Sequence, residues 1–225
     1  MQTSNQKFHK ERWLWGAVLL LLWGGAGALF YWTHGDLSVQ ELLRYQPENK
    51  LLAALAMCGL FLLKSVDFLL HSGVLYALDG ILFPLPYAFA MNLLGIVILA
   101  VVPYEIGRAL GAPLMDSLRD KYPKLRDAEA LVQSSDFLLT FLMRLIGVPL
   151  CAVGMYLGAR RMDRRAYLLG SVLGLIPSMI PYTLMGDNAT DPSSPLFVGA
   201  AAGEVFIHVA ALAVFFLLQR KKKSA

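Results

Sequence analysis

The sequence predicts an all-α integral membrane protein, built as an inverted repeat of two re-entrant hairpins. Each hairpin is followed by a transmembrane helix, and further transmembrane helices flank the repeat at its N- and C-terminal ends. Three observations lead to this fold class. Of the 225 residues, 57% are hydrophobic, and they fall in runs of membrane length. One such run, 141–158, is interrupted by Arg144, Gly147 and Pro149, and glycines recur at the same spacing in both halves.

The first predicted span is Trp13 to Thr33, which follows a basic cytoplasmic N-terminus at 1–12. Its 21 residues carry no charge and are too many for the core of a signal peptide, so we expect a retained helix. A membrane domain at 34–220 follows. Its first half is predicted to contain a hairpin at about 51–85 and a span at 86–107, and a cytoplasmic amphipathic linker follows at 108–136. Its second half is predicted to contain a hairpin at 137–158 and spans at 166–186 and 196–218. A basic cytoplasmic tail at 219–225 ends the chain.

Two independent arguments predict the hairpin at 137–158. A buried arginine and a Gly-Val-Pro break are both costly in a plain spanning helix, and non-helical backbone at membrane depth is tolerated only beside protein or a wet cavity. The linker and the four-arginine turn at 160–165 both belong on the cytoplasmic side, so the segment between them must enter and leave on that side. The same count requires an odd number of crossings between residues 50 and 108, which a hairpin plus one span provides.

The glycine pattern predicts that the two halves are repeats. Two glycines seven residues apart, followed by two that are twelve apart, occur twice: Gly73, Gly80, Gly95 and Gly107 in the first half, and Gly147, Gly154, Gly174 and Gly186 in the second. Opposed hairpins that are each followed by a span form an inverted repeat with a site near the bilayer midplane. This arrangement is typical of transporters.

Arg144 is the strongest candidate for function because it is the one charge between Asp136 and Arg160. At hairpin depth its guanidinium could clamp a phosphate with two parallel hydrogen bonds, whereas the alternative is that it snorkels to the interface. The substrate-binding candidates are Arg144, Gly147, Pro149, Asp79 and Gly80. For Asp79 a structural ion pair is the alternative.

A second set of candidates could relay a proton or an ion. Lys64, Asp67 and His71 have the i, i+3, i+7 spacing of one helical face, which predicts an ion pair beside a titratable group, with a purely structural pair as the alternative. Glu204 has His208 four residues later on the last span and would form a carboxylate–imidazole pair. The last relay candidate is Glu105; its alternative is a helix-end pair with Arg108.

Several function classes are excluded by what the sequence lacks. It contains no HExxH, CxxC, GxSxG or P-loop motif, and its four histidines show no metal spacing, so neither an enzyme nor a cofactor is expected. Cys58 and Cys151 lie in apolar runs and are interpreted as small core residues. The net charge of +4 sits in short flanks, which indicates membrane orientation and no nucleic-acid partner.

The stretch 73–111 begins with a predicted hairpin and ends in Gly107-Arg108-Ala-Leu-Gly111, a G-R-x-x-G signature. It resembles the first hairpin and span of the DedA superfamily, and more narrowly of its SNARE-associated (VTT-domain) branch. The stretches RLIGVPLCAVGMYLGA and LLGSVLGLIPSMIPYTLMG resemble that branch's second hairpin and the span after it. The resemblance covers roughly residues 50–190.

This resemblance implies a polytopic protein that moves lipids across bilayers, as in polyprenyl-phosphate recycling in bacteria or phospholipid scrambling in eukaryotic relatives. Arg144 matches the arginine that opens the family's R-x-x-P hairpin pattern. Here Gly147 stands where that proline is usual, proline is at 149, and the second arginine of the DedA hairpin is missing. Asp67 and Asp79 are the nearest matches to the acidic residues of the first hairpin.

The sequence therefore predicts a multi-pass protein of the bacterial plasma membrane, with both termini in the cytoplasm, that moves a phosphate-bearing lipid between leaflets as a flippase or scramblase. The expected partners are membrane lipids (phospholipid or polyprenyl phosphate), with protons or Na⁺ as candidate coupling ions and a homo-oligomer as a candidate assembly.

The rival interpretation is a membrane scaffold or assembly factor in which Arg144 pairs with Asp67 or Asp79. An ion channel is a weaker alternative because no stripe of polar residues is evident. The C-terminal lysines also fit a dilysine retrieval signal.

Overall fold

The computed structural model describes residues 49–67, 70–132, 135–145 and 148–223. All regular structure in these ranges is helical. The chain divides into compact units at 1–43 and 44–225, and the description below concerns the second unit. Its helices are α3 (Lys50–Val66), α4 (Ser72–Leu82), α5 (Leu85–Leu110), α6 (Ala112–Lys121), α7 (Pro123–Leu131), α8 (Asp136–Leu145), α9 (Leu150–Ala159), α10 (Arg164–Asp187) and α11 (Pro195–Lys223). The first span predicted at 13–33 lies outside the described residues, as does Gly147.

Three helices in the described ranges are long and apolar enough to cross a membrane: α5, α10 and the Pro195–Phe215 part of α11. They overlap the spans predicted at 86–107, 166–186 and 196–218. Large apolar side chains stay exposed along them, such as Leu169 and Phe206. Such side chains cost little in lipid and much in water, which supports a helical membrane protein.

Each predicted hairpin consists of two short helices with a break between them. In the first, α3 ends at Val66 and Asp67 has extended backbone (φ −89°, ψ 138°). The chain becomes helical again at Ser72, where the His71 Nδ1 atom caps α4 by accepting the Gly73 N–H. In the second, α8 ends at residue 145 and α9 begins at residue 150. Pro149 precedes α9 with its φ fixed at −52°, which suits the start of a helix.

The break at Asp67 corrects one prediction. Lys64, Asp67 and His71 were expected on one helical face, but only Lys64 lies within α3. Asp67 ends that helix, and His71 starts the next one with extended backbone (φ −78°, ψ 133°). The three residues do not share a helical face because Asp67 and His71 cap two different helices.

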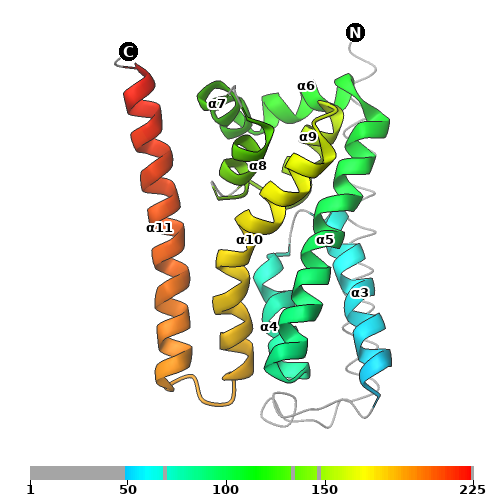
Figure 1. Ribbon diagram of the computed structural model, residues 1–225, viewed down its shortest axis with the longest axis vertical. Helices are drawn as coiled ribbons and strands as arrows, with labels where there is room; N and C mark the ends of the chain where they lie inside the picture. The colour runs from blue at the N-terminus through cyan, green and yellow to red at the C-terminus, as the bar shows by residue number, and fades with distance from the viewer. Residues whose placement is uncertain (1–48, 68–69, 133–134, 146–147, 224–225) are drawn as a thin grey trace. The chain divides into compact units, whose positions relative to one another are not determined.

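The two pairs of short helices open toward opposite ends of the described unit (Figure 1). α3 and α4 open toward the end where α10 turns into α11, whereas α8 and α9 open toward the end where α6 and α7 lie. The second arm of each pair packs on the long helix of the other half, α4 on α10 and α9 on α5. These helices approach so closely that a side-chain carbon at Gly80 would collide with the Thr183 carbonyl, and one at Gly107 with the Met155 carbonyl.

The largest cluster of buried apolar side chains lies between α5, α8, α9, the linker helices and the start of α10. Tyr104 and Tyr167 stack there with ring centroids 4.5 Å apart, and the Tyr104 hydroxyl donates to the Met162 carbonyl. The α6–α7 linker is therefore packed on the helices that it connects, and it holds the open end of the α8–α9 pair.

Candidate functional site

A cavity of about 260 Å³ lies where the two helix breaks meet. Its walls come from both halves and from the last helix. The residues that line it are Lys64, Leu70, His71, Ser72, Tyr76, Arg144, Leu145, Val148, Pro149, Leu150, Leu175, Ser178, Tyr182 and His208. The cavity thus joins residues up to 144 positions apart, from Lys64 to His208, in one pocket.

Arg144 is held in this wall by four hydrogen bonds to uncharged groups. Its Nε and Nη2 atoms donate to Ser171 Oγ at 3.2 and 3.0 Å, and Nη2 also donates to the Tyr167 hydroxyl at 2.7 Å. Its Nη1 atom donates to the Leu150 carbonyl at 2.9 Å. Because a guanidinium has five N–H groups, these bonds leave one on Nη1 for a ligand. Only 6% of Arg144 is exposed, so the side chain is fixed before any ligand arrives.

The charge of Arg144 has no carboxylate partner within the described part of the chain. Its contacts are the four hydrogen bonds above and the face of the Tyr167 ring, 5.6 Å from the guanidinium carbon. The internal pair with Asp67 or Asp79, which the scaffold interpretation required, is not formed, because Arg144 turns toward α10. A buried cation that is hydrogen-bonded but not neutralised favours an anion beside it.

Further positive potential reaches the same cavity. Lys64 is 4% exposed, and its Nζ atom donates to the Asp67 carbonyl oxygen at 2.8 Å. His71 and His208 also line the cavity, and no carboxylate does so among the described residues. The helices α4 and α9 both begin at this wall, and the N-terminal end of a helix carries roughly half a positive charge. The arrangement is suited to bind an anion.

Glu204 lies just outside the cavity on α11. Its Oε1 atom is 3.1 Å from Nδ1 of His208, which does line the cavity. The contact is close without hydrogen-bond geometry, since both Glu204 oxygens are buried and lack a hydrogen-bond partner in the described ranges. The predicted carboxylate–imidazole neighbours are therefore brought together beside the cavity.

Three other predicted site residues lie away from the cavity. Asp79 and Gly80 are buried in α4 where it packs on α10, and neither Asp79 oxygen has a hydrogen-bond partner among the described residues. Glu105 is half-exposed near the end of α5 and forms an ion pair with Arg164 at 2.9 Å. The expected Glu105–Arg108 pair is replaced by this contact, because Glu105 faces the start of α10.

The partners of Arg144 were missed by reasoning from the sequence. Tyr167 and Ser171 are four residues apart, so they share one face of the span predicted at 166–186. That spacing indicates that the two hydroxyl groups lie together. Only the packing of α10 against α8 shows that they accept hydrogen bonds from Arg144. In the described ranges no group of three His, Cys, Asp or Glu side chains could hold a metal ion.

Comparison with known proteins decides the family. The model of the VTT domain matches residues 70–188, which is 119 of 225 residues and more than half of the chain. The chain belongs to the VTT-domain family. This confirms the resemblance to the DedA superfamily and its SNARE-associated branch. No curated protein and no solved structure matches the chain.

The VTT domain, as matched here, runs from Leu70 to Asn188 and so contains α4 to α10 with Arg144, Tyr167 and Ser171. Two contributors to the cavity lie outside the match, Lys64 on α3 and His208 on α11. The cavity of this VTT-domain protein is thus completed by helices on either side of the family domain.

Proposed function

We propose that this protein moves a phosphate-bearing lipid between the leaflets of the plasma membrane, with both termini in the cytoplasm. The observation that carries the proposal is the cavity lined by Arg144, Lys64 and two histidines and by no described carboxylate. A phosphate group carries the charge and the oxygen geometry that a fixed guanidinium binds best. Membership of the VTT-domain family supports a membrane substrate.

In this proposal the α3–α4 and α8–α9 pairs are re-entrant, each entering and leaving the bilayer on one side. Their breaks would then meet near the midplane, and the cavity would place polar groups where the hydrocarbon barrier is otherwise unbroken. A headgroup would cross through the cavity while its tails stay in lipid. Because one N–H of Arg144 is not bonded to any described residue, the phosphate need not displace the partners that Arg144 has among them.

Lys64 and His208 would contribute in a different way from Arg144. Lys64 already donates to a backbone carbonyl, and His208 lies beside Glu204, so both can adjust their contacts when an anion enters or leaves. A transport site must release its substrate as well as bind it. One fixed cation with adjustable neighbours meets both requirements.

The test is lipid translocation in liposomes that contain the purified full-length protein. A fluorescent phospholipid and a fluorescent polyprenyl phosphate are followed by the loss of outer-leaflet signal after a membrane-impermeant quencher is added. We expect the wild-type protein to accelerate exchange of at least one of them and Arg144→Ala to abolish the acceleration. Measurements with and without a pH gradient show whether protons are coupled to transport.

Two further variants separate a lost site from a lost fold. Arg164→Ala also removes one arginine, but from an exposed ion pair outside the cavity, and it should retain wild-type rates. Arg144→Lys retains the charge without the planar fork and should retain part of the activity. If neither lipid moves faster with wild-type protein than in empty liposomes, the scaffold interpretation replaces this proposal.

A further inference from the structure

A second basic pocket lies at the end of the unit that holds the linker helices. Its volume is about 340 Å³, and it is lined by Arg119 of α6, Arg126, Glu129 and Ala130 of α7, and Arg160 at the end of α9. None of these residues lines the anion cavity described above. The pocket therefore needs an explanation of its own.

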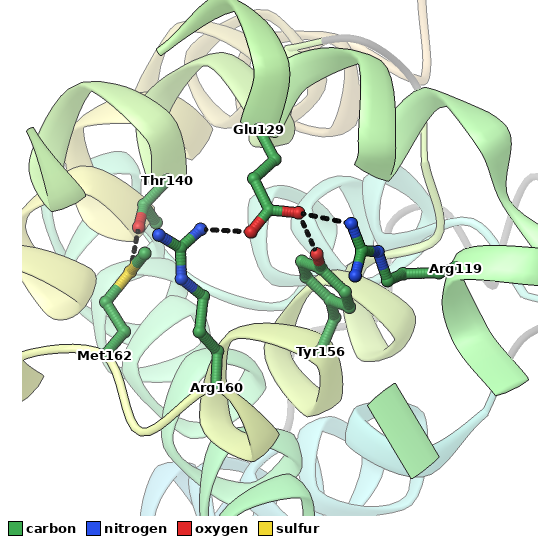
Figure 2. Close-up of polar contacts among 6 residues, drawn as sticks. All are labelled: Arg119, Glu129, Thr140, Tyr156, Arg160 and Met162. Atoms are coloured by element: carbon green, nitrogen blue, oxygen red, sulfur yellow. Dashed lines mark hydrogen bonds and ion pairs between the residues drawn. The ribbon is translucent and has the colours of Figure 1, made fainter. Parts of the chain in front are cut away.

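Figure 2 shows how the carboxylate of Glu129 sits between two guanidinium groups. Its Oε1 atom is 2.7 Å from Arg160 Nη1. Its Oε2 atom accepts from the Tyr156 hydroxyl at 2.5 Å and is 3.4 Å from Arg119 Nη2. The Tyr156 hydroxyl and Arg160 thus donate hydrogen bonds to this carboxylate and Arg119 forms an ion pair with it, so that both arginines are held beside Glu129.

The pocket remains strongly positive after this pairing. Three arginines face one carboxylate, so the lining carries a net charge of +2. Arg126 is exposed and forms no ion pair with any of the described residues, so its guanidinium is available to a ligand. Arginines in a fixed arrangement can bind the oxygens of one phosphate group from several directions.

We propose that Arg119, Arg126 and Arg160 form a second anion site that binds a phosphate group. The ligand is either the headgroup of an anionic lipid or free phosphate, because both present the same oxygens. Arg126 would supply hydrogen bonds from a guanidinium that forms no ion pair with the described residues, and Arg119 and Arg160 would add charge from beside Glu129. Glu129 repels the ligand and so limits its affinity. This site does not depend on lipid transport through the cavity.

The test is isothermal titration of the purified full-length protein in phosphate-free detergent buffer, in separate runs with inorganic phosphate and with a short-chain phosphatidate. All variants carry Arg144→Ala, so that the cavity between the two halves does not contribute to the measured binding. Arg126→Gln should weaken binding by about tenfold, the effect of losing one charge-assisted hydrogen bond. The matched control is Arg165→Gln, which removes an exposed arginine outside the pocket and should leave affinity unchanged.

Glu129→Gln makes the test independent of folding effects. If the carboxylate competes with the ligand, this substitution strengthens binding, which a purely structural role for Glu129 does not predict. An Arg126 effect on both titrants assigns the site to the phosphate group itself, and an effect on phosphatidate alone assigns it to a lipid headgroup. The proposal is overturned if Arg126→Gln and Arg165→Gln bind both titrants equally.

Discussion

The two halves of the described unit share one packing scheme but carry different chemistry. In the first half, Gly95 packs on Phe61 of α3, and in the second, Gly174 packs on Phe141 and Arg144 of α8. The glycines twelve residues later each lie against the short second arm of the other half, Gly107 on α9 and Gly186 on α4. Small residues at the same spacing thus produce the same contacts twice, with the halves exchanged.

The polar residues do not follow this symmetry. Asn92 lies three residues before Gly95, and Ser171 lies three residues before Gly174. Asn92 donates to the Tyr76 carbonyl at 3.1 Å and to Thr183 Oγ1 at 2.9 Å, so it joins α5 to α4 and α10. Ser171 instead accepts two hydrogen bonds from Arg144. The glycines therefore produce the same helix packing in both halves. The fixed guanidinium that we assign to the anion, Arg144, lies only in the second half.

The largest expected effect, a loss of stability, comes from substituting the glycines at which the helices of the two halves pack. Gly107→Ala and Gly186→Ala would each push a side-chain carbon into a backbone carbonyl of the helix packed against it, which cannot yield as a side chain can. We expect each to destabilise the protein by about 3 kcal/mol or more. Gly59→Ala on α3 meets open space and should be neutral or stabilising by roughly 0.5–1 kcal/mol. Thermal unfolding in detergent measures all three, and a wild-type melting temperature for Gly186→Ala would contradict the α4–α10 packing.

A smaller effect is expected from replacing Arg144, the cation that lies only in the second half. Arg144→Lys cannot reproduce the contacts to Ser171, Tyr167 and Leu150 at once, because an ammonium lacks the planar fork. Losing hydrogen bonds to a charged group costs about 1.5–3 kcal/mol, so the translocation rate should fall by about tenfold to a hundredfold. An unchanged rate in reconstituted liposomes would mean that any cation at position 144 suffices.

Substitutions at the equivalent positions Asn92 and Ser171 should affect different properties, protein stability in the first case and phosphate affinity in the second. Ser171→Ala removes the acceptor for two Arg144 bonds and should weaken phosphate binding by about tenfold. Asn92→Ala removes two neutral bonds, so it should lower stability by about 2 kcal/mol and leave phosphate affinity unchanged. Titration and thermal unfolding of both variants check the pattern. Equal effects on affinity would show that the halves are not chemically distinct.

The smallest effect is expected at the exposed ion pair between Glu105 and Arg164. Both side chains are about half-exposed, and such pairs contribute about 0–1 kcal/mol. Arg164→Ala should therefore shift the melting temperature little and leave translocation at the wild-type rate. A large loss of transport in this variant would extend the functional region to the end of α5.

Much of the fold could be predicted because its helices and turns depend on residues that are close together in the sequence. Runs of apolar residues and Lys/Arg-rich turns predict the long helices, and Pro149 predicts the break before α9. Arg144 was found from the cost of a charge in an apolar run. The sequence could not show that α3 ends at Val66, because nothing near Asp67 breaks a helix as strongly as proline does.

The pairing of Glu204 with His208 could be predicted because both lie on one helix, but the neighbours of Arg144 and Glu105 could not, because they depend on contacts between distant helices. Nothing local shows that Arg144 meets Ser171 and Tyr167, or that Glu105 faces Arg164. The same limit applies to the second basic pocket. Its three arginines are spread from position 119 to 160, and they converge only because α6 and α7 fold onto the end of α9.

The most direct test of the account is the affinity of a short-chain phosphatidate for the cavity between the two halves. We would measure its dissociation constant in Arg126→Gln protein, where the second basic pocket is weakened, with and without Arg144→Ala. We expect Arg144→Ala to weaken binding by at least about tenfold and Arg164→Ala in the same background to have no effect. Equal affinity with and without Arg144, in protein that remains folded, would contradict the claim that this arginine binds the phosphate.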